Sequence, residues 1–90
     1  MKVSVKPQLA EAKVQKHHYK GYEYWITLEP AKHDSTNETV FLAYVSNNEP
    51  DWLNQGSLVK DQNGDVMIAN NELVAFANSK EIVQAGIDRL

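Results

Sequence analysis

Apolar and polar side chains alternate most clearly between residues 22 and 29, where every second residue is large and apolar. The apolar members are Tyr22, Tyr24, Ile26 and Leu28. A period of two is typical of a strand that buries one face. Pro30 is expected to end this strand, and the polar run at 31–38 predicts a surface loop.

The segment 39–45 predicts a second long strand, because β-branched and aromatic residues fill it and neither face is polar. We expect such a strand in the centre of the sheet. Val3 and Val5 alternate with polar neighbours and predict a short strand before Pro7. Residues 8–18 fit either a strand or a helix, and we favour the strand.

A long connection is expected at 46–56, where residues 50–53 predict one helical turn that Gly56 closes in a left-handed conformation. Asn63-Gly64 is a strong hairpin signal and predicts strands at 57–60 and 66–69. A turn at Asn70-Asn71 is then expected to lead into a short strand at 73–76.

The C-terminal residues predict a helix that begins at Asn78, because Glu81 follows three residues later in a capping-box pattern. The expected apolar stripe consists of Ile82, Val83, Gly86, Ile87 and Leu90, and the side chains expected to face water are those of Lys80, Glu81, Gln84 and Arg89. The elements together predict an α+β fold: a twisted antiparallel sheet or partly open barrel of five to six strands with one C-terminal helix.

The 90 residues are expected to form one domain, 1–90, with little room for a deep catalytic cleft. No pattern of nucleophile and base indicates an enzyme, and nothing indicates a cofactor. The chain has no cysteine, which excludes disulfides and thiolate metal sites and favours a cytoplasmic location. We also expect no signal peptide and no membrane span, because the N-terminus lacks a long apolar run.

Charge is distributed unevenly along the chain, whose formal net charge is -3. Residues 1–20 hold five lysines against Glu11 alone, a local charge of +4, which leaves -7 for the remaining residues. The basic segment either lies across the acidic body of the same molecule or meets an anionic partner. The first interpretation is the simpler one, because lysines on solvated faces are common.

The stretch that begins at Asp61 resembles the calcium loop of EF-hand and dockerin modules. Ligand-type residues occupy the first, third, fifth and twelfth positions, namely Asp61, Asn63, Asp65 and Glu72. A calcium loop needs glycine at its sixth position, where Val66 stands here. We therefore predict a hairpin and no metal site, with this loop as the alternative.

Two aromatic segments, Lys20-Gly21-Tyr22-Glu23-Tyr24 and Val40-Phe41-Leu42-Ala43-Tyr44, resemble the two ribonucleoprotein motifs of cold-shock domains. The resemblance implies a barrel on which aromatic side chains stack on bases while lysines follow the phosphates. Glu23 stands where that family has a small glycine. The residues themselves favour a different role, in which the aromatic side chains pack the core of a small sheet.

These observations lead to two functional hypotheses. We favour a small, acidic, non-enzymatic binding module that acts by protein–protein contact, of the inhibitor, immunity or regulatory type, with a protein as its partner. The alternative is a single-stranded nucleic-acid-binding barrel of the OB or cold-shock type, with nucleic acid as its partner. The predicted binding residues are Lys16, His18, Lys20, Tyr22, Tyr24, Trp25 and Trp52.

Overall fold

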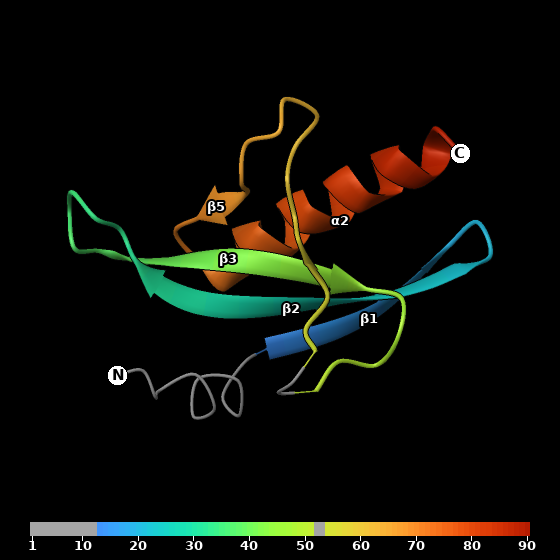
Figure 1. Ribbon diagram of the computed structural model, residues 1–90, viewed down its shortest axis with the longest axis horizontal. Helices are drawn as coiled ribbons and strands as arrows, with labels where there is room; N and C mark the ends of the chain where they lie inside the picture. Colours follow the sequence, from blue (N-terminus) through green and yellow to red (C-terminus); the bar gives the residue numbers. More distant parts are fainter. Residues whose placement is uncertain (1–12, 52–53) are drawn as a thin grey trace.

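The computed structural model describes residues 13–51 and 54–90, which form an antiparallel sheet and one helix packed on it (Figure 1). The elements are β1 (Lys13–Tyr19), β2 (Tyr22–Lys32), β3 (Thr39–Ser46), β4 (Ser57–Leu58), β5 (Ile68–Ala69) and α2 (Glu72–Asp88). The strand order is β1-β2-β3-β4, and β5 also pairs with β3. The sheet does not close into a barrel, so the predicted α+β fold is confirmed in its open form.

The hairpin of β1 and β2 is closed by a two-residue turn at Lys20 and Gly21. Both residues have positive φ, 50° and 85°, which is the geometry of a type I′ turn. That turn matches the right-handed twist of the paired strands, and every residue of β1 pairs with a residue of β2. The strand predicted within 8–18 is confirmed from Lys13 onwards, whereas residues 8–12 and the strand predicted at Val3 and Val5 lie outside the described residues.

Pro30 does not end β2, which continues to Lys32 and pairs with β3 up to Lys32 and its partner Thr39. The prediction was wrong because a proline is tolerated where its missing N–H is not needed for pairing. The turn at 33–38 is closed by the backbone hydrogen bond from His33 N to Glu38 O (2.8 Å). Because hydrogen-bonded pairs alternate along an antiparallel ladder, the odd-numbered residues of β2 are the ones that bond to β3. Pro30 is even-numbered, so its nitrogen faces away from β3.

The predicted hairpin around Asn63-Gly64 is present as a tight turn, but its flanking strands are shorter than expected. The Asp61 N–H donates to Asp65 O at 2.9 Å, and Lys60 and Val66 form a single bridge. β4 and β5 pair with β3 instead of with each other. Within the preceding connection, Trp52 and Leu53 of the predicted helical turn lie outside the described residues, and Gly56 has the expected positive φ of 103°.

Helix α2 begins six residues before the predicted start at Asn78 and replaces the strand expected at 73–76. Its N-cap is Asn71, whose Oδ1 accepts a hydrogen bond from the Val74 N–H at 2.9 Å. Val74 and Phe76 favour strands by propensity, but the cap and the neighbouring helix formers outweigh that preference. Asn78 therefore lies within the helix.

The buried face of α2 differs in part from the predicted stripe. Ala75 and Ser79 are its fully buried residues, and Ile82, Val83 and Ile87 pack against the core from partly buried positions. Leu90 was expected in the stripe but is 85% exposed, since it follows the end of the helix. Gln84 was expected to face water, yet its Nε2 donates to the Tyr24 hydroxyl at 3.4 Å.

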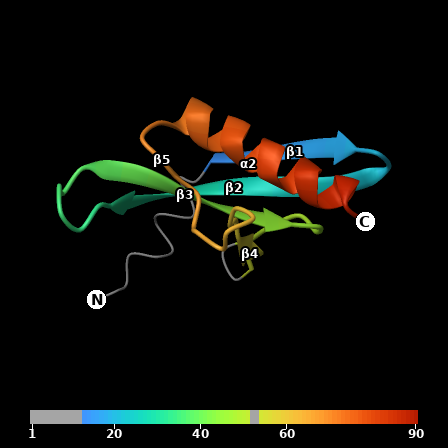
Figure 2. The ribbon, with the colours of Figure 1, turned by 90° about the horizontal axis from the view of Figure 1, so that it is seen from above.

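The core lies between α2 and one face of the sheet. Figure 2 shows α2 running obliquely above the long strands. The buried apolar side chains of this cluster are Tyr24, Ile26, Leu28, Ala43, Val59, Met67, Ala69 and Ala75. No helix among the described residues is both long and apolar enough to cross a membrane.

The N-cap gives a direct test of where the helix begins. We expect Asn71→Ala to lower the free energy of unfolding by about 0.5–2 kcal/mol, because the first turn loses its side-chain acceptor. Asn78→Ala is the matched control and should change it by less than about 0.5 kcal/mol, because Asn78 is exposed within the helix. Urea denaturation of both variants measures this, and a larger loss for Asn78→Ala would contradict the assignment.

Candidate binding surface

Six of the seven predicted binding residues lie on the β1–β2 hairpin, and the pairing of the strands divides them between two faces. Tyr22 and Tyr24 are on the face that carries α2, whereas Lys16, His18 and Trp25 are on the opposite face. Lys20 is in the turn between the strands. Trp52, the seventh, lies outside the described residues.

The three residues on the face opposite α2 gather around Glu23. The His18 Nε2 lies 2.8 Å and the Lys16 Nζ lies 3.6 Å from the Glu23 Oε2. Lys16 also lies over the Trp25 ring, 5.2 Å from its centroid. The hydrogen bond from His18, followed by the charge of Lys16, lowers the pKa of Glu23, so this carboxylate remains ionised at neutral pH. The negative charge of Glu23 thus neutralises much of this basic cluster.

On the helix-bearing face, the two tyrosines have different environments. Tyr24 is 3% exposed and stacks on the His17 ring, with 5.4 Å between the ring centroids. Tyr22 is 49% exposed, although it lies on the same face of the same strand. Tyr24 therefore belongs to the core, and Tyr22 presents a large aromatic side chain to solvent.

A polar clamp joins the tip of the hairpin to the end of α2. The Tyr19 hydroxyl donates to both Asp88 oxygens at 3.0 and 3.2 Å, and the Lys20 Nζ lies 2.6 Å from Oδ1 of the same carboxylate. The hydrogen bonds from Lys20 and from Tyr19 both lower the pKa of Asp88, and the bond from Lys20 has the larger effect. The clamp fixes the position of the neighbouring Tyr22 relative to the helix.

Beside this clamp lies a groove of about 470 Å³ between the start of β2, the end of β3, the start of β4 and the last turns of α2. We call it the hairpin groove. Its apolar surface comes from Tyr24, Val45, Val83 and Ile87, and Tyr22 stands at its edge. The volume falls within the range of ligand sites in proteins, so the groove can accept a few side chains.

The rim of the hairpin groove is polar but almost uncharged. Amide and hydroxyl groups come from Ser46, Asn47, Asn48, Asn54 and Ser57. The Ser46 hydroxyl already bonds to the backbone of Asn48. It accepts from the Asn48 N–H at 3.1 Å and donates to the Asn48 carbonyl oxygen at 2.7 Å. Among the described residues, Glu23 is the one charged residue of the lining, and no lysine, arginine or histidine takes part. Such a rim suits peptide groups, and it offers nothing to neutralise a phosphate.

Sequence reasoning located the hairpin but missed the rest of the groove. Val83 and Ile87 were predicted for the apolar face of the helix, yet their place beside Tyr22 depends on how α2 crosses the sheet. The Asn47-Asn48 pair carried no signal beyond that of a polar loop. The feature that could have indicated a site is the concentration of asparagine after a central strand.

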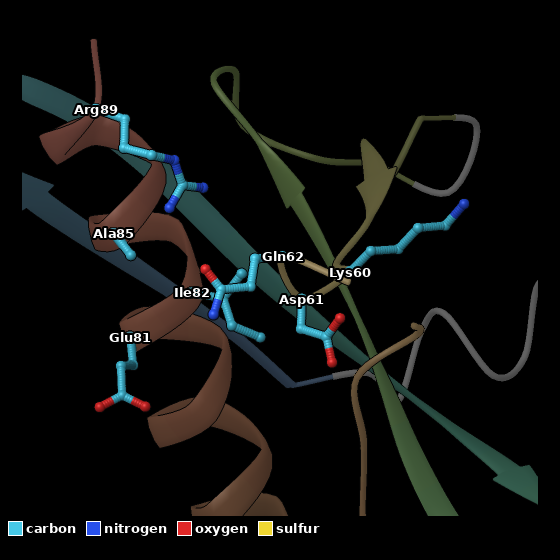
Figure 3. A pocket seen from close by; sticks show the side chains of 7 residues that line it. All are labelled: Lys60, Asp61, Gln62, Glu81, Ile82, Ala85 and Arg89. Carbon is cyan, nitrogen blue, oxygen red and sulfur yellow. The ribbon is translucent and has the colours of Figure 1, made fainter. Parts of the chain in front are cut away.

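A smaller hollow of about 230 Å³ lies between α2 and the turn at 61–65 (Figure 3). Its charged lining residues are Lys60, Asp61, Glu81 and Arg89. Figure 3 shows the Lys60 and Glu81 side chains pointing away from the gap and Arg89 reaching toward Gln62. This hollow lacks a convergent set of groups, so the hairpin groove is the better candidate.

The calcium-like loop is organised by its own backbone. Asp61 Oδ1 accepts hydrogen bonds from the N–H groups of Asn63 and Asp65, at 2.9 and 3.0 Å. Glu72 lies at the start of α2, and the described residues contain no group of three or more potential metal-ligating side chains. Hydrogen bonds within the turn therefore occupy a carboxylate oxygen of Asp61, the residue that would supply the first ligand of a calcium loop.

The chain was compared with models of protein families, with curated proteins and with solved structures, and none of them matches it.

The clamp predicts a measurable titration. In an NMR titration, Asp88 should show a pKa below the ordinary value of about 3.9, and Lys20→Ala should raise it toward that value. Because the pKa is lowered in the folded protein, the clamp contributes stability above the ordinary pKa and loses it as the pH falls below. Glu23 is the control, since its lowered pKa depends on His18 and Lys16 and should not respond to Lys20→Ala. An unchanged Asp88 pKa in the variant would contradict the clamp.

Proposed function

We propose that this protein is a non-enzymatic binding module that acts by contact with another protein and uses the hairpin groove as its contact site. The observation that carries the proposal is the half-exposed Tyr22 at the edge of an apolar groove whose rim holds neutral amides and hydroxyls. Tyrosine is enriched among residues that dominate binding energy at protein interfaces. We further propose that the module is of the inhibitor, immunity or regulatory type. The proposed location is the cytoplasm, because the chain has no cysteine.

The geometry gives less support to a nucleic-acid-binding platform. Such a platform needs aromatic side chains side by side on an open face. Of the aromatic residues in the two cold-shock-like segments, Tyr24 is buried and Phe41 packs against the core, both on the helix-bearing face. Tyr44 lies on the other face, where its hydroxyl donates to Glu29 at 3.0 Å. Tyr22 is then the one remaining aromatic side chain of the two segments, and its neighbour Glu23 is negative.

The proposal is tested by affinity capture from the lysate of cells that produce the protein, with and without nuclease. We expect a defined protein to be retained after nuclease treatment and lost with Tyr22→Ala. Truncating a central tyrosine at an interface commonly costs about 2 kcal/mol or more of binding.

Ile68→Ala is the matched control, because Ile68 is similarly exposed, at 50%, but lies on the face opposite α2. Melting temperatures establish that both variants fold. Equal loss of the partner with the two variants, or release of all bound material by nuclease, would refute the hairpin groove as a protein-contact site.

A further inference from the structure

The outer edge of β1 is unpaired in the described part of the chain. β1 is seven residues long and pairs with β2 alone. A two-residue type I′ hairpin makes Tyr19 and Tyr22 a hydrogen-bonded pair, so odd-numbered residues of β1 bond to β2. The backbone N–H and C=O groups of Val14, Lys16 and His18 therefore point outward. Such an edge is a template for another strand.

Helix α2 runs in the same direction as β1 but crosses the sheet obliquely, and its first turns lie beside the start of β1. Leu73 and Phe76 line a groove of about 380 Å³ together with residues 13–15. Further along, the charge of Lys80 adds to burial in lowering the pKa of His17. At the far end Asp88 contacts Tyr19 and Lys20. Side chains of the helix thus reach β1 near its first residue, at His17 and at its last residue.

The groove beside β1 combines an apolar end with a basic flank. Leu73, which lines this groove, is 82% exposed, a high value for a large apolar side chain. Lys13 and Lys80 form no salt bridge within the described ranges. Glu72 is the one acid of the lining and stands at the beginning of the helix. Excess positive charge is therefore concentrated here in a protein of net charge -3.

We propose that the free edge of β1 and the adjoining flank of α2 bind an extended, acidic segment of a partner protein, which joins the sheet as an additional strand. Backbone hydrogen bonds to Val14, Lys16 and His18 hold the segment. Its alternate side chains face the helix, where apolar ones contact Leu73 and Phe76 and acidic ones meet Lys13 and Lys80. This contact is separate from the hairpin groove and does not depend on it.

The charge of β1 argues against a second copy of the chain as the occupant. β1 contains two lysines and two histidines and no acid. In an antiparallel self-pair centred on Lys16, this lysine would stand opposite its own copy, and like charges in that position destabilise a sheet. The same lysines attract an acidic strand, so one feature disfavours self-association and favours the proposed partner.

The proposal is tested with a synthetic peptide of about eight residues, enough to span β1, in which threonine alternates with residues that face the helix. Of these helix-facing residues, the ones beside Leu73 and Phe76 are valine and the others are glutamate. Backbone amide exchange is followed by NMR on the full chain. The peptide should slow exchange at Val14, Lys16 and His18, while Gln15 and His17 are protected already. A peptide with lysine in place of glutamate should bind far more weakly, and salt should weaken the binding of the acidic one.

Charge reversal provides the second arm. Lys80, whose charge acts on His17 of β1, is changed to glutamate: Lys80→Glu should weaken binding of the acidic peptide roughly fivefold. Lys60→Glu, the same change at a lysine that lines the smaller hollow, should leave the binding unaltered. Tyr22→Ala should also leave it unaltered, which separates this site from the hairpin groove. No slowing of exchange at the outward amides, equal binding of the two peptides, or dimers formed through β1 would overturn the proposal.

Discussion

Ile26→Ala is expected to lower the free energy of unfolding by about 2–5 kcal/mol. Ile26 is fully buried at the centre of the sheet, where it lies between Gln15 of β1 and Val45 of β3. Removing its outer atoms leaves a cavity that the paired strands cannot close. A domain of this size is stabilised by about 5–15 kcal/mol in total, so the loss is a large fraction. Urea denaturation monitored by tryptophan fluorescence measures it.

Ile68→Ala is the control for this core substitution. The same atoms are removed from a side chain that is 50% exposed at the edge of the sheet. The expected loss is below about 1 kcal/mol, because most of the removed surface already contacts water. Losses of the same size for the two isoleucines would contradict the position assigned to the core.

Gly56→Ala is expected to be the second severe substitution, with a loss of more than about 2 kcal/mol. Gly56 has a φ of 103°, which side chains of L-amino acids rarely adopt. An added Cβ would also overlap with the Val45 carbonyl group, 2.7 Å from its carbon atom. The clashing carbonyl group belongs to the backbone of β3 and cannot rotate away as a side chain could. The chain at Gly56 and the adjoining β4 must therefore move away from β3, and this displaces one wall of the hairpin groove.

Two other glycines separate the contributions of strain and overlap. Gly64 has a φ of 85°, but a Cβ there meets nothing within 4 Å, so Gly64→Ala should cost about 1–2 kcal/mol from strain alone. Gly86 lies in α2 with open space around it, and Gly86→Ala should stabilise the protein by about 1 kcal/mol. Thermal denaturation ranks the three variants, and a Gly56→Ala variant as stable as Gly64→Ala would refute the close approach to β3.

Local patterns were sufficient to predict the sheet. Alternation at 22–29 and the apolar run at 39–45 identified the two central strands, because their side chains must match a pleated and buried surface. Pro30 was misleading, since its effect depends on which neighbour each backbone group of β2 bonds to, and that requires the register. The pairing of β4 and β5 with β3 is likewise a long-range property that no short window contains.

The start of α2 shows where two local signals competed. Asn78 carried the capping-box signal, whereas Asn71 was predicted only as part of a turn, and Val74 and Phe76 favoured a strand. The outcome depends on tertiary packing: Ala75 and Ser79 are small enough to lie against the sheet, and both are fully buried there. Small residues that permit a close approach carry little hydrophobic signal, so the first turns of the helix were hidden.

The candidate site was predictable only in part, for a related reason. The sequence indicated the hairpin and its aromatic side chains, but alternation alone does not reveal which face a helix will cover. Once α2 is placed, Tyr24 becomes part of the core and Tyr22 becomes the exposed ring of the pair. Val83 and Ile87 complete the groove from a segment about sixty residues away along the chain.

Photo-crosslinking from the hairpin groove tests the central claim most directly. A benzophenone side chain is placed at Tyr22 and, as a matched control, at Ile68 on the opposite face. Illumination in the producing cells should join position 22, and not position 68, to one protein, and the product should resist nuclease. Crosslinks from position 22 to nucleic acid alone, or to the same protein from both positions, would contradict the assignment of the hairpin groove as a protein-contact site.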